Sequence, residues 1–158
     1  MKAKAPWTTR TSSRPAPAAR ATSAIVGKTL ISATAAGQII GPFVFDFNET
    51  HIYNASWPPH AKFHNAQTMS SGVALSVATL VNLWRPGSGR VGLDAAALSA
   101  SVYWVSQLSA FFYPGTASMD PPGKDNWPQL RYTIPILAAI GTGYALARRG
   151  LNAATRTR

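Results

Sequence analysis

The chain has 158 residues, the size of one domain, and its mean hydropathy is close to zero. It contains no cysteine, which excludes disulfides and thiolate metal sites. The formal net charge is +10, but the charges gather at the chain ends and in short connecting segments, so we expect no nucleic-acid partner.

Three windows of the sequence contain no Asp, Glu, Lys or Arg: residues 63–84, 95–113 and 132–147. A helix needs about 20 mainly apolar residues to cross a hydrocarbon core that is roughly 30 Å thick. The windows have about this length, and charged segments separate them. We therefore predict an integral, multi-pass membrane protein.

The first 23 residues predict a disordered basic tail, because five Lys or Arg side chains stand among Ala, Pro, Ser and Thr without an acid. A cleavable organelle-targeting peptide is the alternative, since such peptides are also rich in Arg and Ser. Residues 150–158 form a second short basic tail. The expected membrane domain covers residues 24–149.

Four helices are expected within this domain. In the first, Gly37 and Gly41 have the small-xxx-small spacing that lets two helices approach closely. The second begins at Pro58 and Pro59, because proline suits a first helical turn. The short turns between helices favour an all-α fold, an antiparallel four-helix transmembrane bundle. The expected spans are residues 24–45, 58–84, 91–113 and 131–147.

The distribution of basic residues gives the orientation of the four spans. Every Lys and Arg except Lys62, Lys124 and Arg131 falls on the face that holds both chain ends. Basic residues mark the cytoplasmic side of membrane proteins. We therefore expect both termini in the cytoplasm, with the segment after Asp46 and the 114–130 loop on the opposite face.

All three histidines of the chain, His51, His60 and His64, lie between Asp46 and Gln67. A dense group of titratable side chains at a bilayer boundary is a candidate functional site. His60 and His64 are four residues apart, so both rings project from one face if a helix begins at the prolines.

Two histidines at this spacing can bind one metal ion, with a third ligand from His51, Asp46 or Glu49. Imidazole and carboxylate ligands suit zinc or non-haem iron. The glutamate that follows the first histidine in zinc proteases is missing, because Ala61 stands there. The spacing therefore suggests a metal without naming its chemistry.

The same residues suit general acid–base catalysis without a metal, because Asp46 or Glu49 can orient a histidine that moves protons near neutral pH. His51, His60 and His64 are then the catalytic groups that act on a lipid-like substrate. The apolar pocket expected for this substrate is lined by Trp57, Gln67, Tyr103, Trp104, Gln107 and Tyr132.

A structural interpretation is also open. Trp57, His60 and His64 can belong to a belt of aromatic rings at the head-group level of the membrane. This interpretation accounts for the aromatic residues, but it does not explain why every histidine lies in one short stretch.

Two runs in the central stretch, DFNETH from Asp46 to His51 and WPPHAKFH from Trp57 to His64, carry a family resemblance. They resemble a family of small four-span membrane proteins of unknown function from fungi and bacteria, some labelled as acetyltransferases. The general plan also looks like the sterol-isomerase and sigma-receptor superfamily. The acidic pocket residues of that superfamily have no counterpart in residues 63–84, so the likeness implies a lipid pocket by analogy alone.

We thus expect a membrane protein that binds or converts a lipid-like or other hydrophobic small molecule at a histidine-rich site on the non-cytoplasmic face. Its expected partners are membrane lipid and that hydrophobic molecule, with a homo-oligomer through the Gly37 and Gly41 face as a further option. The alternative is a non-catalytic accessory or transporter subunit that assembles through helix packing. The sequence leaves open whether the protein is an enzyme.

Overall fold

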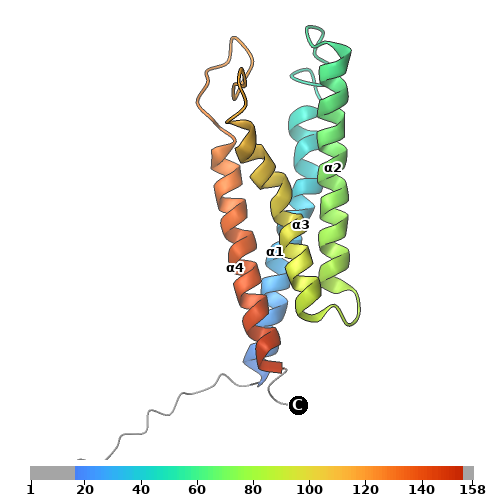
Figure 1. Cartoon of the computed structure of the whole chain (residues 1–158), viewed down its shortest axis with the longest axis vertical. Helices are drawn as coiled ribbons and strands as arrows, with labels where there is room; N and C mark the ends of the chain where they lie inside the picture. The colour runs from blue at the N-terminus through green and yellow to red at the C-terminus, as the bar shows by residue number, and fades with distance from the viewer. Residues whose placement is uncertain (1–16, 155–158) are drawn as a thin grey trace, which may run out of the picture.

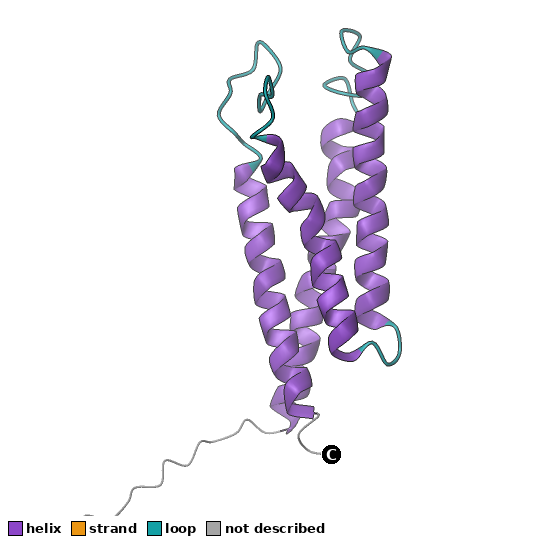
Figure 2. Ribbon diagram, in the orientation of Figure 1, coloured by secondary structure: helices purple, strands orange, loops and turns teal. Residues whose placement is uncertain are grey.

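The computed structural model describes residues 17–154, which form four α-helices and no strand (Figures 1 and 2). The predicted all-α four-helix bundle is therefore confirmed. The prolines at the start of the second helix act as the sequence predicts, since proline suits a first helical turn. The third helix, predicted over residues 91–113, begins two residues earlier and ends three residues earlier. The helices are α1 (Pro17–Asp46), α2 (Pro59–Trp84), α3 (Gly89–Ala110) and α4 (Leu130–Ala154).

The first and last helices are longer than predicted. α1 begins at Pro17, within the range predicted as a disordered tail, and α4 continues to Ala154, within the predicted carboxyl tail. Packing explains the extension, because a Cβ at Gly150 would meet the backbone oxygen of Arg20 at 2.6 Å. The predicted tail and targeting peptide at residues 1–16 lie outside the described residues.

Consecutive helices run antiparallel, so the start of α1, the 85–88 turn and the end of α4 share one end of the bundle (Figure 1). The 47–58 segment and the 111–129 loop share the other end, which we call the loop end. α1 packs more extensively against α4 than against α2, although α1 and α4 are the farthest apart in sequence. The bundle is therefore closed by its first and last helices.

Glycines allow this close approach, but they are not the predicted ones. A Cβ at Gly27 would overlap the carbonyl oxygen of Gly143, and a Cβ at Gly143 would meet Ile31 Cγ1 at 2.9 Å. Gly37 and Gly41 have nothing within 4 Å of a built Cβ. Among residues 17–154, nothing therefore packs closely against the small-xxx-small pair, because it lies on a different face of α1 from the one that meets α4.

The interior of the bundle is built largely from small and polar side chains. Ile31, Leu83 and Leu93 are its largest fully buried apolar residues, while Gln38 is 1% exposed and donates from Nε2 to the Gly72 carbonyl oxygen at 3.0 Å. The other buried polar residues are Ser76, Thr79, Ser118 and Thr133. Large apolar side chains lie instead on the outer surface of all four helices, as Val91, 74% exposed, illustrates.

Among the described residues, one helix, over Ala18–Asp46, is long and apolar enough to cross a membrane by length and composition. Core helices of soluble proteins and signal sequences also meet this criterion. α2, α3 and α4 do not meet it, because Asn, Gln, Ser, Thr and His or Arg side chains lower their hydropathy. The prediction of four membrane spans therefore finds support from hydropathy in α1 alone.

Candidate functional site

The segment between α1 and α2 folds around Asn48. Its Nδ2 donates to the Phe45 carbonyl oxygen at 2.9 Å, which satisfies an acceptor left free at the end of α1. Its Oδ1 accepts from the backbone nitrogen of Thr50 at 2.8 Å and from the Thr50 hydroxyl at 2.6 Å. This side-chain turn fixes the position of the next residue, His51.

His51 lies beside Asp46, the last residue of α1. Its Nδ1 is 3.9 Å from Asp46 Oδ1 and 2.7 Å from the hydroxyl of Thr50. Asn65 of α2 donates from Nδ2 to the second carboxylate oxygen of Asp46 at 3.4 Å. Both His51 and Asp46 are partly buried, with side-chain exposures of 33% and 22%. The predicted pairing of His51 with a carboxylate is thus present in the geometry.

Trp57 connects this pair to the 111–129 loop. Its ring meets the His51 ring edge to face, with centroids 4.9 Å apart. Its Nε1 donates to Asp120 Oδ2 at 2.8 Å. Glu49, the other carboxylate predicted for the site, is exposed in the same segment. Asp120, which was not among the predicted site residues, is therefore the acid that Trp57 contacts.

His60 and His64 form a second, more exposed group on the first turns of α2. Their Nε2 atoms are 3.1 Å apart, and His64 Nδ1 is 3.3 Å from Gln67 Oε1. The His60 ring stacks on Phe63 with an interplanar angle of 4°. The prediction that both histidines project from one face of a helix agrees with these contacts.

The spacing of this pair suits two ligands of a metal ion, because two imidazole nitrogens bound tetrahedrally to zinc at about 2.0–2.1 Å lie roughly 3.3 Å apart. No third protein ligand lies beside this pair among the described residues. No group of three or more His, Cys, Asp or Glu side chains that could hold a metal occurs among residues 17–154. His51 does not complete the set, since it is held in the loop by Thr50.

The six residues predicted to line one apolar pocket lie in different places. Trp57 bonds Asp120, and Gln67 contacts His64. Tyr103 and Trp104 pack edge to face on α3, and Tyr132 packs against Phe45 with ring centroids 5.7 Å apart. Gln107 borders the hollow described next. The contacts of these residues thus differ, and a single pocket lined by all six stays a prediction.

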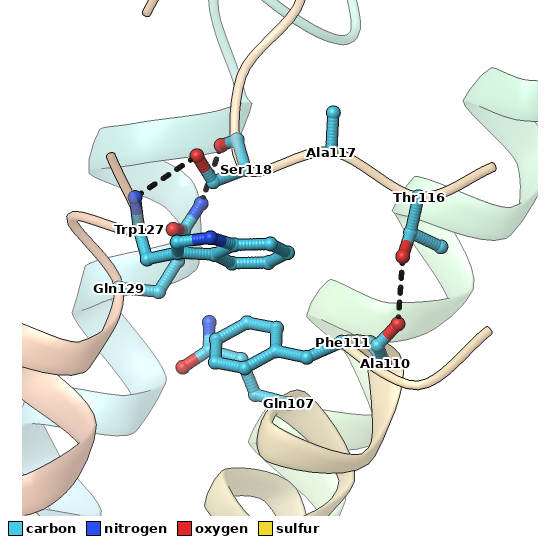
Figure 3. A pocket seen from close by; sticks show the side chains of 8 residues that line it. All are labelled: Gln107, Ala110, Phe111, Thr116, Ala117, Ser118, Trp127 and Gln129. Carbon is cyan, nitrogen blue, oxygen red and sulfur yellow. Dashed lines mark hydrogen bonds between the residues drawn. The ribbon is translucent and has the colours of Figure 1, made fainter. Parts of the chain in front are cut away.

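The hollow beside Gln107 has a volume of about 140 Å³ and lies between the end of α3 and the 111–129 loop (Figure 3). Its walls include the rings of Phe111 and Trp127, whose centroids are 4.2 Å apart. Sequence reasoning missed most of these residues, and the only signal for them is a tryptophan in a long loop. Besides two alanines, the lining residues are Gln107, Phe111, Thr116, Ser118, Trp127 and Gln129.

Ser118 organises the loop that closes the hollow. This serine is 8% exposed. It donates from Oγ to Asp125 Oδ1 and accepts at Oγ from the Trp127 backbone nitrogen at 3.1 Å. Its carbonyl oxygen accepts from Gln129 Nε2 at 2.7 Å. The hydrogen bonds from Ser118 lower the pKa of Asp125 below its ordinary value of 3.8, since they favour the ionised carboxylate.

Trp127 and Gln129 each carry an unusual feature. Trp127 has a φ of 52°, in the left-handed region, which costs a residue other than glycine about 1–2 kcal/mol. Gln129 Oε1 is buried and has no hydrogen-bond partner among the described residues, which typically costs about 1–3 kcal/mol. The strained backbone of Trp127 and the unpaired acceptor of Gln129 therefore border the same hollow.

Comparison with known proteins gives one match, over residues 30–158, to a family described as "Family of unknown function (DUF6640)". The chain belongs to this family. The match includes the histidines, the Trp57–Asp120 contact and the whole lining of the hollow. No curated protein and no solved structure matches the chain. Membership of the DUF6640 family agrees with the resemblance to a family of unknown function and assigns no activity.

Proposed function

We propose that this DUF6640 protein is an integral membrane protein whose four helices all lie in the bilayer. What supports this is the reversed distribution of polarity in the bundle. Gln38 and Thr79 are buried, while Phe43 on α1, Val81 on α2 and Leu98 on α3 are each at least 45% exposed. In water such a surface would favour aggregation, whereas in lipid it is the expected outer face.

The close packing of small residues supports the same proposal. Helices in lipid gain no hydrophobic stabilisation from each other, so they depend on close backbone approach and on interhelical hydrogen bonds. Both are present: Gly27 against Gly143, and Thr133 donating to Gln107 Oε1 between α4 and α3. The basic residues Arg85, Arg90 and Arg149 lie at the end opposite the loops, which we assign to the cytoplasmic side.

We further propose that the loop end binds a lipid-like or other hydrophobic small molecule, with His51 acting on its polar part. The observation that carries this proposal is the Asp46–His51–Trp57–Asp120 chain of contacts, which joins both loops around a partly buried imidazole. A carboxylate beside one imidazole nitrogen orients the ring and favours proton transfer at the other.

An aromatic surface lies at the same end of the bundle as this chain of contacts. Phe43, Phe47 and Tyr53 form a row, with ring centroids 6.1 Å and 5.3 Å apart, and all three are about half exposed. Tyrosine rings favour the head-group level of a membrane, which suits Tyr53, and the two phenylalanine rings add apolar surface beside it. We propose that the apolar part of the bound molecule lies along this row and its polar part at His51.

Lipid co-purification tests this function. The full chain, purified in mild detergent, is compared by mass spectrometry with the His51→Gln and His64→Gln variants. We expect a defined lipid in the wild type that is reduced about tenfold in His51→Gln and retained in His64→Gln, whose ring lies outside the Asp46 pair. A lipid profile equal to that of the bulk membrane in all three proteins would refute the proposal.

Metal binding by the second histidine group is a separate option. His60 and His64 would give two ligands to zinc or non-haem iron, and the remaining positions would be taken by the bound molecule or water. Elemental analysis of the purified chain tests this option directly.

A non-catalytic subunit is the competing function, and one observation favours it. Gly37 and Gly41 lie open on α1 beside Ile40, which is 61% exposed, so a second transmembrane helix has room to approach there. Cross-linking in membranes separates the functions. The assembly role would be favoured if Gly37→Leu lost the oligomers seen in the wild type and neither protein carried bound lipid.

A further inference from the structure

The hollow between the end of α3 and the 111–129 loop is separate from the His51 contacts and takes no part in the proposed chemistry there. Three features mark it: two aromatic walls, a buried serine that fixes its loop, and two glutamine amides (Figure 3). We propose that it binds an uncharged ring-sized molecule that carries a hydroxyl group. This inference does not depend on the function proposed for the histidines.

The size of the ligand follows from the volume. At about 140 Å³ the hollow is close to a cavity of roughly 150 Å³ that holds one benzene molecule in another protein. Phe111 and Trp127 provide the aromatic surface for such a ring, since their rings contact each other and leave no room between them. The ligand therefore packs beside this pair, as aromatic rings commonly do in offset or edge contacts.

The absence of charge in the ligand follows from the lining. Among the described residues that border the hollow, none is charged, and the nearby Asp125 already accepts from both the hydroxyl and the backbone nitrogen of Ser118. A charged ligand would lose hydration there without gaining a counter-ion. A neutral molecule avoids this cost.

The side-chain amides of Gln107 and Gln129 explain why the ligand should carry a hydroxyl group. Gln107 Oε1 accepts from the Thr133 hydroxyl, which leaves its Nε2, on the side of Trp127 in Figure 3, as a donor for the ligand. Gln129 uses its Nε2 on the Ser118 carbonyl oxygen and keeps an Oε1 that has no donor. A hydroxyl both accepts and donates, so it satisfies the two amides together.

Binding requires a small movement. Gln129 Oε1 is shielded from solvent. The ligand hydroxyl is expected to reach it when the Trp127 ring, which lines the same hollow, shifts. Trp127 is held with a left-handed backbone by its hydrogen bond to Ser118, a conformation that a shift of the loop would relieve. Ligand binding is therefore expected to change the fluorescence of Trp127, which the difference from a Trp127→Phe variant isolates.

Fluorine NMR on the full chain in detergent tests the proposal with three probes: 4-fluorobenzyl alcohol, 4-fluorotoluene and 4-fluorobenzylamine. We expect saturable binding of the alcohol, at least about fivefold tighter than the toluene, the ratio that a net hydrogen bond provides. Phe111→Leu should weaken binding of the alcohol several-fold. Phe112→Leu is the matched control, because Phe112 is the next residue, is 88% exposed and does not border the hollow.

A second substitution keeps the test decisive if Phe111→Leu does not fold. Gln129→Met removes the unmet acceptor and is expected to abolish the preference for the alcohol, while Gln67→Met on α2 leaves it unchanged. Equal shifts for alcohol and toluene in every protein would mean partition into detergent and would overturn the proposal. Tighter binding of the amine than of the alcohol would overturn the assignment of a neutral ligand.

Discussion

The indole nitrogen of Trp57 donates a 2.8 Å hydrogen bond to Asp120, a residue 63 positions later in the chain. This contact ties the segment after α1 to the loop before α4. Because Trp57 also packs against His51, the position of the imidazole depends on both loops. A change in the 111–129 loop can therefore reach the histidine through Trp57.

Replacing Trp57 by Phe should loosen both loops together. The substitution keeps most of the ring but removes the donor, and a hydrogen bond to a carboxylate contributes about 1.5–3 kcal/mol, less when exposed. Hydrogen exchange should become faster in residues 47–58 and in residues 114–129. Trp84→Phe is the control, since its Nε1 donates to Ser32 at the opposite end of the bundle. Faster exchange in one loop alone would contradict the link.

The α1–α4 contact predicts opposite effects for two glycines of the same helix. Gly27→Ala should destabilise the bundle by about 1–3 kcal/mol, because the new methyl group overlaps the backbone of Gly143. Gly37→Ala should be neutral or stabilising by about 0.5–1 kcal/mol, since its Cβ meets open space. Unfolding in a denaturing detergent measures both. A similar loss for the two variants would disprove this packing.

The hydrogen bonds to Asp125 predict a loss of loop order in acid. The pKa of Asp125 is lowered in the folded chain, so its contribution to stability is present above the ordinary value of 3.8 and disappears as the pH falls through the folded value. Carboxyl ¹³C NMR should report this titration. Ser118→Ala should bring the pKa of Asp125 back towards 3.8, and an unchanged titration would exclude Ser118 as the cause.

Zinc titration should separate the two histidine groups. His60→Ala or His64→Ala is expected to weaken Zn²⁺ binding by at least about tenfold, because only one imidazole of the pair remains. His51→Ala should leave zinc affinity unchanged, since His51 contacts Asp46 and Thr50 instead. Isothermal titration calorimetry measures the affinities. An equal loss in all three variants would indicate a joint site.

The lack of cysteine makes the membrane arrangement directly testable by single-cysteine labelling. Lys124→Cys and Ser56→Cys should react with an impermeant maleimide from one side of the membrane, and Arg85→Cys from the other. Leu98→Cys should stay unlabelled from both sides, although Leu98 is 67% exposed on α3, because lipid covers it. Rapid labelling of Leu98→Cys would place that face in water.

The number of helices and several helix ends could be predicted from the sequence. α2 begins at Pro59 and ends at Trp84, as predicted. Both ends depend on local features: the proline in the first turn and the turn that follows Trp84. The partner of α1 could not be predicted in this way. Gly37 and Gly41 have the better-known spacing, but Gly27 is the residue opposite Gly143, and only the three-dimensional arrangement of the chain decides which face is used.

Prediction of the site was partial for the same reason. The i, i+4 spacing of His60 and His64 predicted their contact, because helix geometry alone brings them together. His51 lies in a loop whose course depends on Asn48, so its separation from that pair could not be read from spacing. Ser118, Trp127 and Gln129 lie in a segment without periodicity, and long-range hydrogen bonds bring them together.

The contact between α1 and α4 has a consequence for how the protein is made. During synthesis α1 is made first and α4 last. α1 therefore cannot pack against its main partner, α4, until synthesis of the helices is complete. α2 and α3 are joined by a short turn and can pair in the meantime. In the proposed membrane arrangement, the glycine face of α1 is open to other membrane helices during that interval, and a chain stopped before α4 would keep it open.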